Sequence, residues 1–361
     1  MKAAPQIRAR RVHGERTRCP SRGVTDTGSR STLPLLLGGV KSYLRLGRQY
    51  SMASLPVDAA YAYAVWMRHV QVLAALGVNG PLSDVVEIGP GNSAATGICA
   101  ILSGARTYTG LDVLDHLAND QVVRLLRETE VLFASRASIP GSDQFPNLRP
   151  VPAHDGFPRA ALSRLFASDA RASEPPASLR QDVERIATGG RRGQRLRFHC
   201  PWSPASLAAA SVDLVFSHAV LQEIPHDDTN SPLQQTFDAN FTWLRPGGIA
   251  SHQIDMAMYG CEPWNVHWTW SDTRWTLIRG RRENFPNREP LSTYVTLARR
   301  AGFTILAAHV DEATGAPRHA LQPRFAGLPD LERRARSVHL VLQRPAESPR
   351  LWHAMTNAVR C

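Results

Sequence analysis

The chain has 361 residues, of which 43% are hydrophobic, and its formal net charge is +11. This composition excludes a chain that is disordered throughout, because it supports a hydrophobic core of ordinary size. The charge is uneven, since residues 1–50 hold eleven basic and two acidic residues. We therefore expect a basic, disordered arm over residues 1–50, with a targeting peptide or an arm for nucleic acid or a membrane surface as alternatives.

The residue usage also excludes several chemistries. Lysine occurs only at Lys2 and Lys41, so the body lacks the amine that Walker-type phosphate loops, Schiff-base aldolases and pyridoxal enzymes require. This preference for arginine is typical of a high-GC, bacterial genome. No apolar run reaches the roughly 18 residues that span a bilayer, and the five cysteines have neither disulfide nor zinc spacing. We expect a cytoplasmic protein.

The hydrophobic pattern predicts an α/β domain over residues 51–345 and a tail over 346–361. A helix over 57–76 precedes a strand at 84–89, a helix at 93–103 and a strand at 106–112, which together form a βαβ unit. A helical insertion is expected over 113–194, with helices near 118–134, 158–168 and 177–188. Later elements are strands at 196–199, 212–217, 249–256, 303–310 and 337–343, and helices near 230–243 and 290–301. This order predicts a doubly wound, seven-stranded, mostly parallel sheet.

A glycine-rich turn follows the first strand, in the segment Glu87-Ile-Gly89-Pro90-Gly91-Asn92-Ser93. Glycines at a strand end let a ligand approach the backbone, and the helix that follows offers free N–H donors. Asp112 ends the next strand and can accept hydrogen bonds from ribose hydroxyls. These two signals indicate a ligand that contains adenosine. They suit an NAD-dependent oxidoreductase as well as other nucleotide-binding proteins.

Two later segments narrow the choice. The strand Val212-Asp-Leu-Val-Phe-Ser217-His218 ends in a polar pair, and the turn Leu244-Arg-Pro-Gly247-Gly248 leads into the next strand. In this order, the four motifs resemble those of class I (Rossmann-like) methyltransferases that depend on S-adenosylmethionine. The resemblance covers roughly residues 55–345 and is nearest to methyltransferase-domain proteins of unassigned substrate.

The resemblance implies S-adenosyl-L-methionine as the cofactor and assigns a role to each matching residue. Glu87, Gly89, Pro90 and Gly91 would line its amino-acid end, with Asn92 and Ser93 beside them. Asp112 would hold the ribose and Val113 would pack on the adenine, whereas Ser217 and His218 would flank the methionine portion. Members of the family carry an Asp after the third strand that accepts a hydrogen bond from adenine, and Ser203 stands in that place here.

Methyl transfer to an oxygen calls for a base near the acceptor, and histidine is the usual choice. The candidates are His218 after the fourth strand, and His252 and Asp255 on the fifth, because ligands bind at the carboxyl ends of such strands. Each of these histidines could instead be a hydrogen-bonded structural residue. A metal site from His252, Asp255 and His267 is an alternative, although its spacing matches no known motif.

Tryptophans crowd the segment 257–290, at positions 264, 268, 270 and 275. They form either a lid over the acceptor or a packed satellite core. The leading hypothesis is methyl transfer to an oxygen of a small molecule or glycan. The alternatives are an NAD-dependent oxidoreductase and a non-catalytic binding protein. Nucleic acid is not the expected acceptor, because no Asn/Asp-Pro-Pro-aromatic tetrapeptide follows the fourth strand. The sequence leaves the oligomeric state open.

Overall fold

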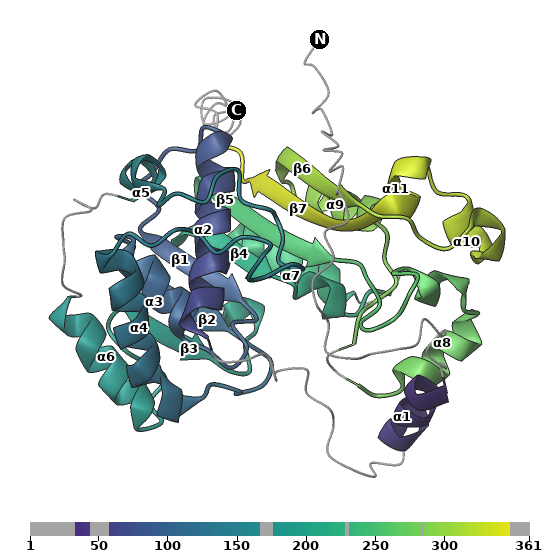
Figure 1. Ribbon diagram of the computed structural model, residues 1–361, viewed down its shortest axis with the longest axis horizontal. Coiled ribbons are helices and arrows are strands. Elements are labelled where there is room, and N and C mark those ends of the chain that lie inside the picture. The colour runs from purple at the N-terminus through teal and green to yellow at the C-terminus, as the bar shows by residue number, and fades with distance from the viewer. Residues whose placement is uncertain (1–32, 44–57, 167–175, 228–230, 283–284, 347–361) are drawn as a thin grey trace, which may run out of the picture.

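The computed structural model describes residues 33–43, 58–166, 176–227, 231–282 and 285–346. At its centre lies a seven-stranded sheet in the order β3-β2-β1-β4-β5-β7-β6 (Figure 1). Its strands are β1 (Asp84–Ile88), β2 (Thr107–Leu111), β3 (Leu196–His199), β4 (Val212–His218), β5 (Leu244–Asp255), β6 (Thr304–Glu312) and β7 (Ala335–Gln343).

Strands β1 to β5 are parallel, and β7 is antiparallel to both β5 and β6. The chain starts in the middle of the sheet, runs outward through β2 and β3, and returns to β4 beside β1. This arrangement confirms the doubly wound, mostly parallel fold class predicted from the sequence. The order of the strands along the sheet reverses between β1 and β4. Open α/β sheets bind ligands at such a point, beyond the carboxyl ends of the strands.

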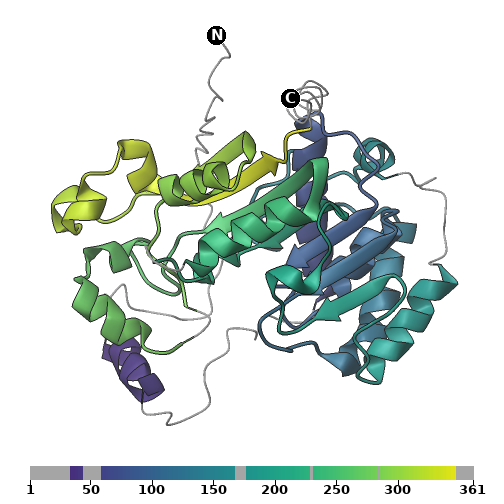
Figure 2. The ribbon, with the colours of Figure 1, turned by 180° about the vertical axis from the view of Figure 1, so that it is seen from behind.

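Helices cover both faces of the sheet (Figures 1 and 2). One face packs against α2 (Ala59–Ala75), α3 (Ala95–Leu102), α4 (Val122–Ala134), α5 (Arg159–Leu165) and α6 (Ala177–Ala187), in one core cluster. The other face packs against α7 (Pro232–Trp243) and α9 (Leu291–Arg300), with α10 (Pro323–Ala326) and α11 (Asp330–Arg334) near the end of the chain. The helices α4, α5 and α6 occupy the expected insertion and belong to the same core as the sheet. No helix in the described ranges is both long enough and apolar enough to cross a bilayer.

Helix α2 carries polar side chains in the middle of an apolar sequence. Asp58 caps its N-terminus by accepting a hydrogen bond from the Ala60 amide at 2.7 Å. Arg68, His69 and Gln71 are all buried. The Arg68 guanidinium donates to the Pro140 carbonyl at 2.8 Å, and the Gln71 amide donates to the His154 carbonyl at the same distance. These bonds hold the segment 139–154 against α2.

The tryptophan-rich segment is part of the core. Trp264 and Trp268 belong to the cluster under α9, and Trp270 packs with Met258 and Ile278 in a smaller cluster. All three indole rings are buried, so they are not available to cover an acceptor. The packing agrees with the satellite core that the sequence offered as the alternative to a lid.

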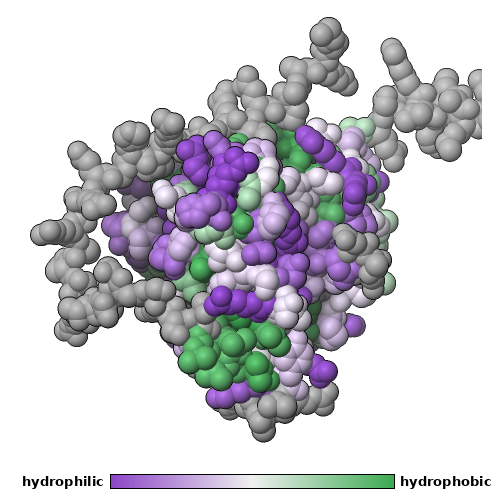
Figure 3. Space-filling view, turned by 90° about the vertical axis from the view of Figure 1, so that its right-hand side faces the viewer, coloured by the Kyte–Doolittle hydropathy of each residue, from purple (hydrophilic) through white to green (hydrophobic). Residues whose placement is uncertain are grey.

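Residues 33–43, which we expected to lie in a disordered arm, form helix α1 (Leu33–Tyr43) packed against α8 (Asp272–Arg279). The expectation was wrong for this stretch, because Gly39 lets the two backbones meet: a Cβ at Gly39 would lie 2.0 Å from the Leu277 carbonyl oxygen. The rest of the expected arm, and the expected tail beyond residue 346, lie outside the described residues. The outer side of α1 leaves apolar side chains exposed, near the lower end of Figure 3.

We expect Gly39→Ala to separate α1 from α8, since overpacking of this kind costs about 1–3 kcal/mol. Amide hydrogen exchange in residues 33–43 and 272–279 should become at least about tenfold faster. Gly38→Ala is the matched control, because its Cβ would meet only the Arg282 side chain, at 3.6 Å. Equal exchange in the two variants would contradict the packing described here.

Candidate functional site

The turn after β1 has the backbone that its glycines predict. Gly89 and Gly91 have φ angles of 71° and 66°, a region that residues with a side chain rarely adopt. A Cβ at Gly89 would lie 2.5 Å from the Val220 side chain, so this glycine allows the end of β4 to touch the turn. A Cβ at Gly91 would meet nothing within 4 Å and would project into open space.

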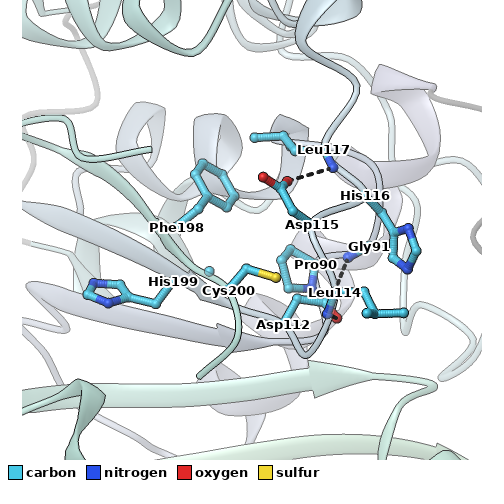
Figure 4. A pocket seen from close by; sticks show the side chains of 11 residues that line it. Pro90, Gly91, Asp112, Leu114, Asp115, His116, Leu117, Phe198, His199 and Cys200 are labelled. Carbon is cyan, nitrogen blue, oxygen red and sulfur yellow. Dashed lines mark hydrogen bonds between the residues drawn. The ribbon is translucent and has the colours of Figure 1, made fainter. Parts of the chain in front are cut away.

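Asp112 lies against this turn, as the sequence predicts. The Gly91 amide donates to one carboxylate oxygen at 3.2 Å (Figure 4). The Val113 amide donates to the other carboxylate oxygen at 2.7 Å. Burial raises the pKa of Asp112, and the amides of Leu114, Val113 and Gly91 partly offset this effect. Gly91 and Asp112 are therefore close enough to contact one nucleoside.

The surroundings of Asp112 suit a nucleoside in chemistry but are tightly packed. Val113 and Leu114 are 54% and 36% exposed, which places apolar side chains beside the carboxylate. The cavity between Pro90, Asp112 and Cys200 measures about 10 Å³, enough for about one water molecule. The residues thus fit an adenosyl group, and its entry requires the side chains that line this cavity to move.

Three further residues expected near the cofactor make local backbone contacts. Ser93 accepts a hydrogen bond from the Ala95 amide at 3.1 Å at the start of α3, and the Asn92 carbonyl accepts from the Ala118 amide at 3.0 Å. Ser203 forms a capping box with Ser206 at the short 3-10 helix Pro204–Ser206. Ser203 does not line the small cavity, whereas Phe198, His199 and Cys200 do, and the sequence analysis did not single out these three residues.

Glu87 is buried behind the turn, where it accepts a hydrogen bond from the Tyr108 hydroxyl. Burial raises its pKa to about 8; the bond from Tyr108 opposes this rise, and the charge of Asp112 adds to it. The carboxyl group is therefore mostly protonated at pH 7. A cation beside it, such as the ammonium group of a methionine moiety, would favour the charged form.

Ser217 and His252 lie side by side near the ends of β1 and β4, but their side chains are buried in the core. Both are fully buried, and the Ser217 hydroxyl lies 2.8 Å from His252 Nδ1. The other ring nitrogen of His252 lies 3.4 Å from the Asn240 side-chain amide. Burial lowers the pKa of His252 to about 3. His252 is thus a hydrogen-bonded core residue, which was the structural alternative for this position.

His218 and Asp255 do come together, in the wall of a second cavity of about 310 Å³. Burial, with the charge of Arg68, lowers the pKa of His218 to about 3, so its imidazole is neutral at pH 7. Burial raises the pKa of Asp255. The sequence analysis missed the remaining residues of this wall, which are Tyr61, residues 144–149, Ala219, Gln253, Asp311, Arg336 and Ser337.

The segment 218–220 runs from the large cavity to the glycine turn after β1. His218 and Ala219 line the large cavity, while Val220 packs on Gly89. Ala219 has a φ of 55°, which is uncommon for a residue with a side chain and is often found at functional sites. Residues 218–220 therefore connect the larger cavity to the predicted nucleotide edge, which is the glycine turn at Gly89 and Gly91 with Asp112 beside it.

The alternative metal site is not assembled. Within the described ranges, no three His, Cys, Asp or Glu side chains lie close enough to hold a metal ion. His267 is buried beside Trp268 and Trp275, and burial lowers its pKa to about 3.

Comparison with solved structures gives distant likenesses. An S-adenosylmethionine-dependent methyltransferase from Methanosarcina mazei is 11% identical, with a TM-score of 0.38, over 74% of this chain and 95% of its own. One from Mesorhizobium loti is 13% identical, with a TM-score of 0.36, over 79% and 100%. The [4+2]-cyclase SpnF is also 13% identical, with a TM-score of 0.36, over 88% and 93%. No protein-family model and no curated protein matches the sequence.

These likenesses are too distant to indicate an activity, and the fold class rests on the sheet itself. The strand order, with β1 to β5 parallel and β7 antiparallel, is that of a doubly wound, mostly parallel sheet whose glycine turn faces Asp112. This outcome confirms the fold class predicted from the sequence.

The protonation of Glu87 predicts a pH-dependent stability. Folding raises the pKa of Glu87 from 4.5 to about 8. The contribution of its proton to the free energy of unfolding is therefore complete below pH 4.5 and is lost as the pH rises to 8. Glu87→Gln removes this loss. The free energy of unfolding of the variant relative to wild type should rise with pH in this window, by at most about 1.4 kcal/mol per unit.

Chemical denaturation at pH 5, 6, 7 and 8 measures this difference. Glu128→Gln on α4 is the control, because that carboxylate is exposed and pairs with Arg124 at 2.8 Å; its profile should run parallel to that of wild type. A parallel profile for Glu87→Gln as well would mean that Glu87 is not protonated in the folded protein.

Proposed function

We propose that this protein transfers a methyl group from S-adenosyl-L-methionine to an oxygen of a small molecule bound in the 310 Å³ cavity. The supporting observation is the segment 218–220, because His218 and Ala219 line that cavity and Val220 touches Gly89 in the glycine turn. Methyl transfer is an in-line displacement, so it needs donor and acceptor held side by side and shielded from water. A cavity beside the glycine turn would hold donor and acceptor side by side.

The residues at the nucleotide edge would divide the binding of the cofactor. Gly91 leaves room for close approach to the backbone, Asp112 would accept hydrogen bonds from the ribose hydroxyls, and Val113 would pack on the adenine. Glu87 would face the ammonium group, whose charge would offset the desolvation that raises its pKa. The cofactor supplies a methyl group on a sulfonium, whose S–CH₃ bond breaks as the new O–CH₃ bond forms.

His218 and Asp255 are the two bases that the cavity offers to an acceptor hydroxyl. The hydroxyl gives up its proton as the oxygen gains the methyl group, and the proton then passes to water. His218 is the nearer base to the nucleotide edge, because Val220 two residues later touches Gly89. Its imidazole is neutral at pH 7 and can accept a hydrogen bond from the hydroxyl, while its lowered pKa makes it a weak base. His252 is no longer a candidate for this role, since it is buried on the other side of the sheet.

The volume of the cavity favours a small molecule over a glycan chain. Pockets for small ligands measure about 300–1,000 Å³, and about 310 Å³ lies at the lower end of this range. Its wall combines aromatic and apolar groups, such as Tyr61, Phe145 and Leu148, with polar ones.

We expect Gly91→Ala to weaken binding of S-adenosylhomocysteine at least about tenfold, because the new methyl group would project into the space that the ligand needs. Gly77→Ala is the matched control: Gly77 has a similar φ of 74°, and its Cβ also meets nothing within 4 Å. Both variants should lose about 1 kcal/mol of stability from backbone strain. Only Gly91→Ala should change the affinity measured by titration calorimetry.

Equal affinities in the two variants would place the cofactor elsewhere. Absence of S-adenosylhomocysteine binding to the wild-type chain at millimolar concentration would end the proposal altogether. Incubation with methyl-labelled S-adenosylmethionine and fractionated cell extract then tests for transfer, which should label a fraction of small molecules.

A further inference from the structure

The wall of the large cavity is formed in part by a polar stripe across four strands. Strand register places Gln253 of β5 beside His218 of β4, and Asp255 beside Ser337 of β7, which in turn pairs with Asp311 of β6. All five residues line the cavity. The neighbouring positions Val338 and Ile254 are apolar and face the other side of the sheet. These five polar groups therefore lie together on the side that carries the cavity.

Several of these polar groups are buried without a partner. Gln253 and Ser337 are each 3% exposed. Among the described residues, Gln253 Oε1, Ser337 Oγ and His218 Nδ1 have no hydrogen-bond partner. A buried polar atom left unpaired costs about 1–3 kcal/mol, and such atoms are rare in folded proteins. Three of them in the wall of one cavity indicate a ligand that carries hydrogen-bonding groups.

The charge of the cavity is set by Arg68, which lies on α2 behind the wall. Arg68 is 1% exposed, and its Nε and Nη1 atoms have no partner among the described residues. The charge of Arg68 lowers the pKa values of Tyr61 and His218, and the charge of Arg149 lowers the pKa of Arg68. Tyr61, His218 and Arg149 all line the cavity. Burial lowers the pKa of Arg68 to about 10, so it stays charged at pH 7.

The other charges of the wall offset one another. Arg149 binds Asp311 at 3.0 Å. Arg336 lowers the pKa of Asp255, against the larger effect of burial. Each acid therefore has an arginine near it, and Arg68 is left as an uncompensated buried cation. Such a charge is costly in a low-dielectric interior unless an anion accompanies it.

We propose that the cavity binds the methyl acceptor as a small hydroxy acid, with its carboxylate in the field of Arg68 and its hydroxyl toward His218. The identification of this ligand as the acceptor rests on the proposed methyl transfer, whereas the binding of an anion does not. Gln253 and Ser337 would hydrogen-bond the polar groups of the acid. Tyr61, which makes an edge contact with Phe145 at 5.5 Å between ring centres, would pack on its apolar body.

Three probes of one shape test the preference for an anion: 4-hydroxybenzoate, 4-hydroxybenzyl alcohol and 4-hydroxybenzylamine. Titration calorimetry with the full chain at pH 7 should show at least tenfold tighter binding of the acid than of the alcohol, and weakest binding of the amine. Equal affinity for the three probes, or a preference for the amine, would overturn the proposal.

The role of Arg68 is tested by Arg68→Met, which keeps an unbranched, flexible side chain and removes the charge. The variant should bind 4-hydroxybenzoate at least tenfold more weakly and the alcohol nearly unchanged. Arg164→Met is the matched control, since Arg164 also donates to a backbone carbonyl of α2, that of Ala74 at 3.2 Å, but is exposed. If Arg68→Met fails to fold, Ser337→Ala replaces it and should weaken binding of the acid about fivefold.

Parallel titrations with S-adenosylhomocysteine separate the two proposals. Binding of the acid without binding of S-adenosylhomocysteine would leave the anion site intact and end the proposed methyl transfer. Binding of S-adenosylhomocysteine without preference for the acid would support the proposed methyl transfer and end the proposal of an anion site. If Arg68→Met weakened S-adenosylhomocysteine binding and left 4-hydroxybenzoate unaffected, Arg68 would hold the carboxylate of the cofactor, and the inference about the acceptor would be wrong.

Discussion

The close approach of Val220 to Gly89 determines how the two cavities lie relative to each other. A Cβ at residue 89 would lie 2.5 Å from Val220, so only glycine allows the end of β4 to rest on the turn after β1. This contact fixes the segment 218–220, whose other side faces the large cavity. The left-handed backbone of Ala219 is part of the same bend. A single steric constraint therefore places a nucleotide edge and a small-molecule cavity on opposite sides of three residues.

The polar stripe on the sheet has two ends with different surroundings. At the inner end, Ser251 Oγ lies 2.8 Å from His69 Nδ1 and 2.8 Å from His339 Nε2, which joins α2 to β5 and β7. Among the described residues, His69 Nε2 and His339 Nδ1 have no partner, and at the outer end Gln253 Oε1 and Ser337 Oγ have none either. The outer end differs because Gln253 and Ser337 line the large cavity, where a ligand could reach their polar atoms.

Local sequence signals predicted the fold and the nucleotide edge, because glycine turns and strand periods depend on nearby residues. They could not decide which side of the sheet a strand residue faces. Ser217 and His218 are adjacent and point to opposite sides, and the same alternation separates His252 from Asp255. Of these four residues, His218 and Asp255 line the large cavity, whereas Ser217 and His252 are buried in the core. Arg68 carried a signal that was overlooked: a cation in the middle of an apolar helix.

Glu87 and Arg68 are two buried ionisable groups that respond differently to their surroundings. Glu87 avoids a buried charge by keeping its proton to about pH 8. Arg68 has no such route, because its pKa stays near 10 despite burial. An anionic group of a ligand beside Arg68 would therefore gain more binding free energy than a cationic group beside Glu87. Since the charge of Arg68 acts on both His218 and Tyr61, which line the large cavity, this gain would belong to a ligand of that cavity.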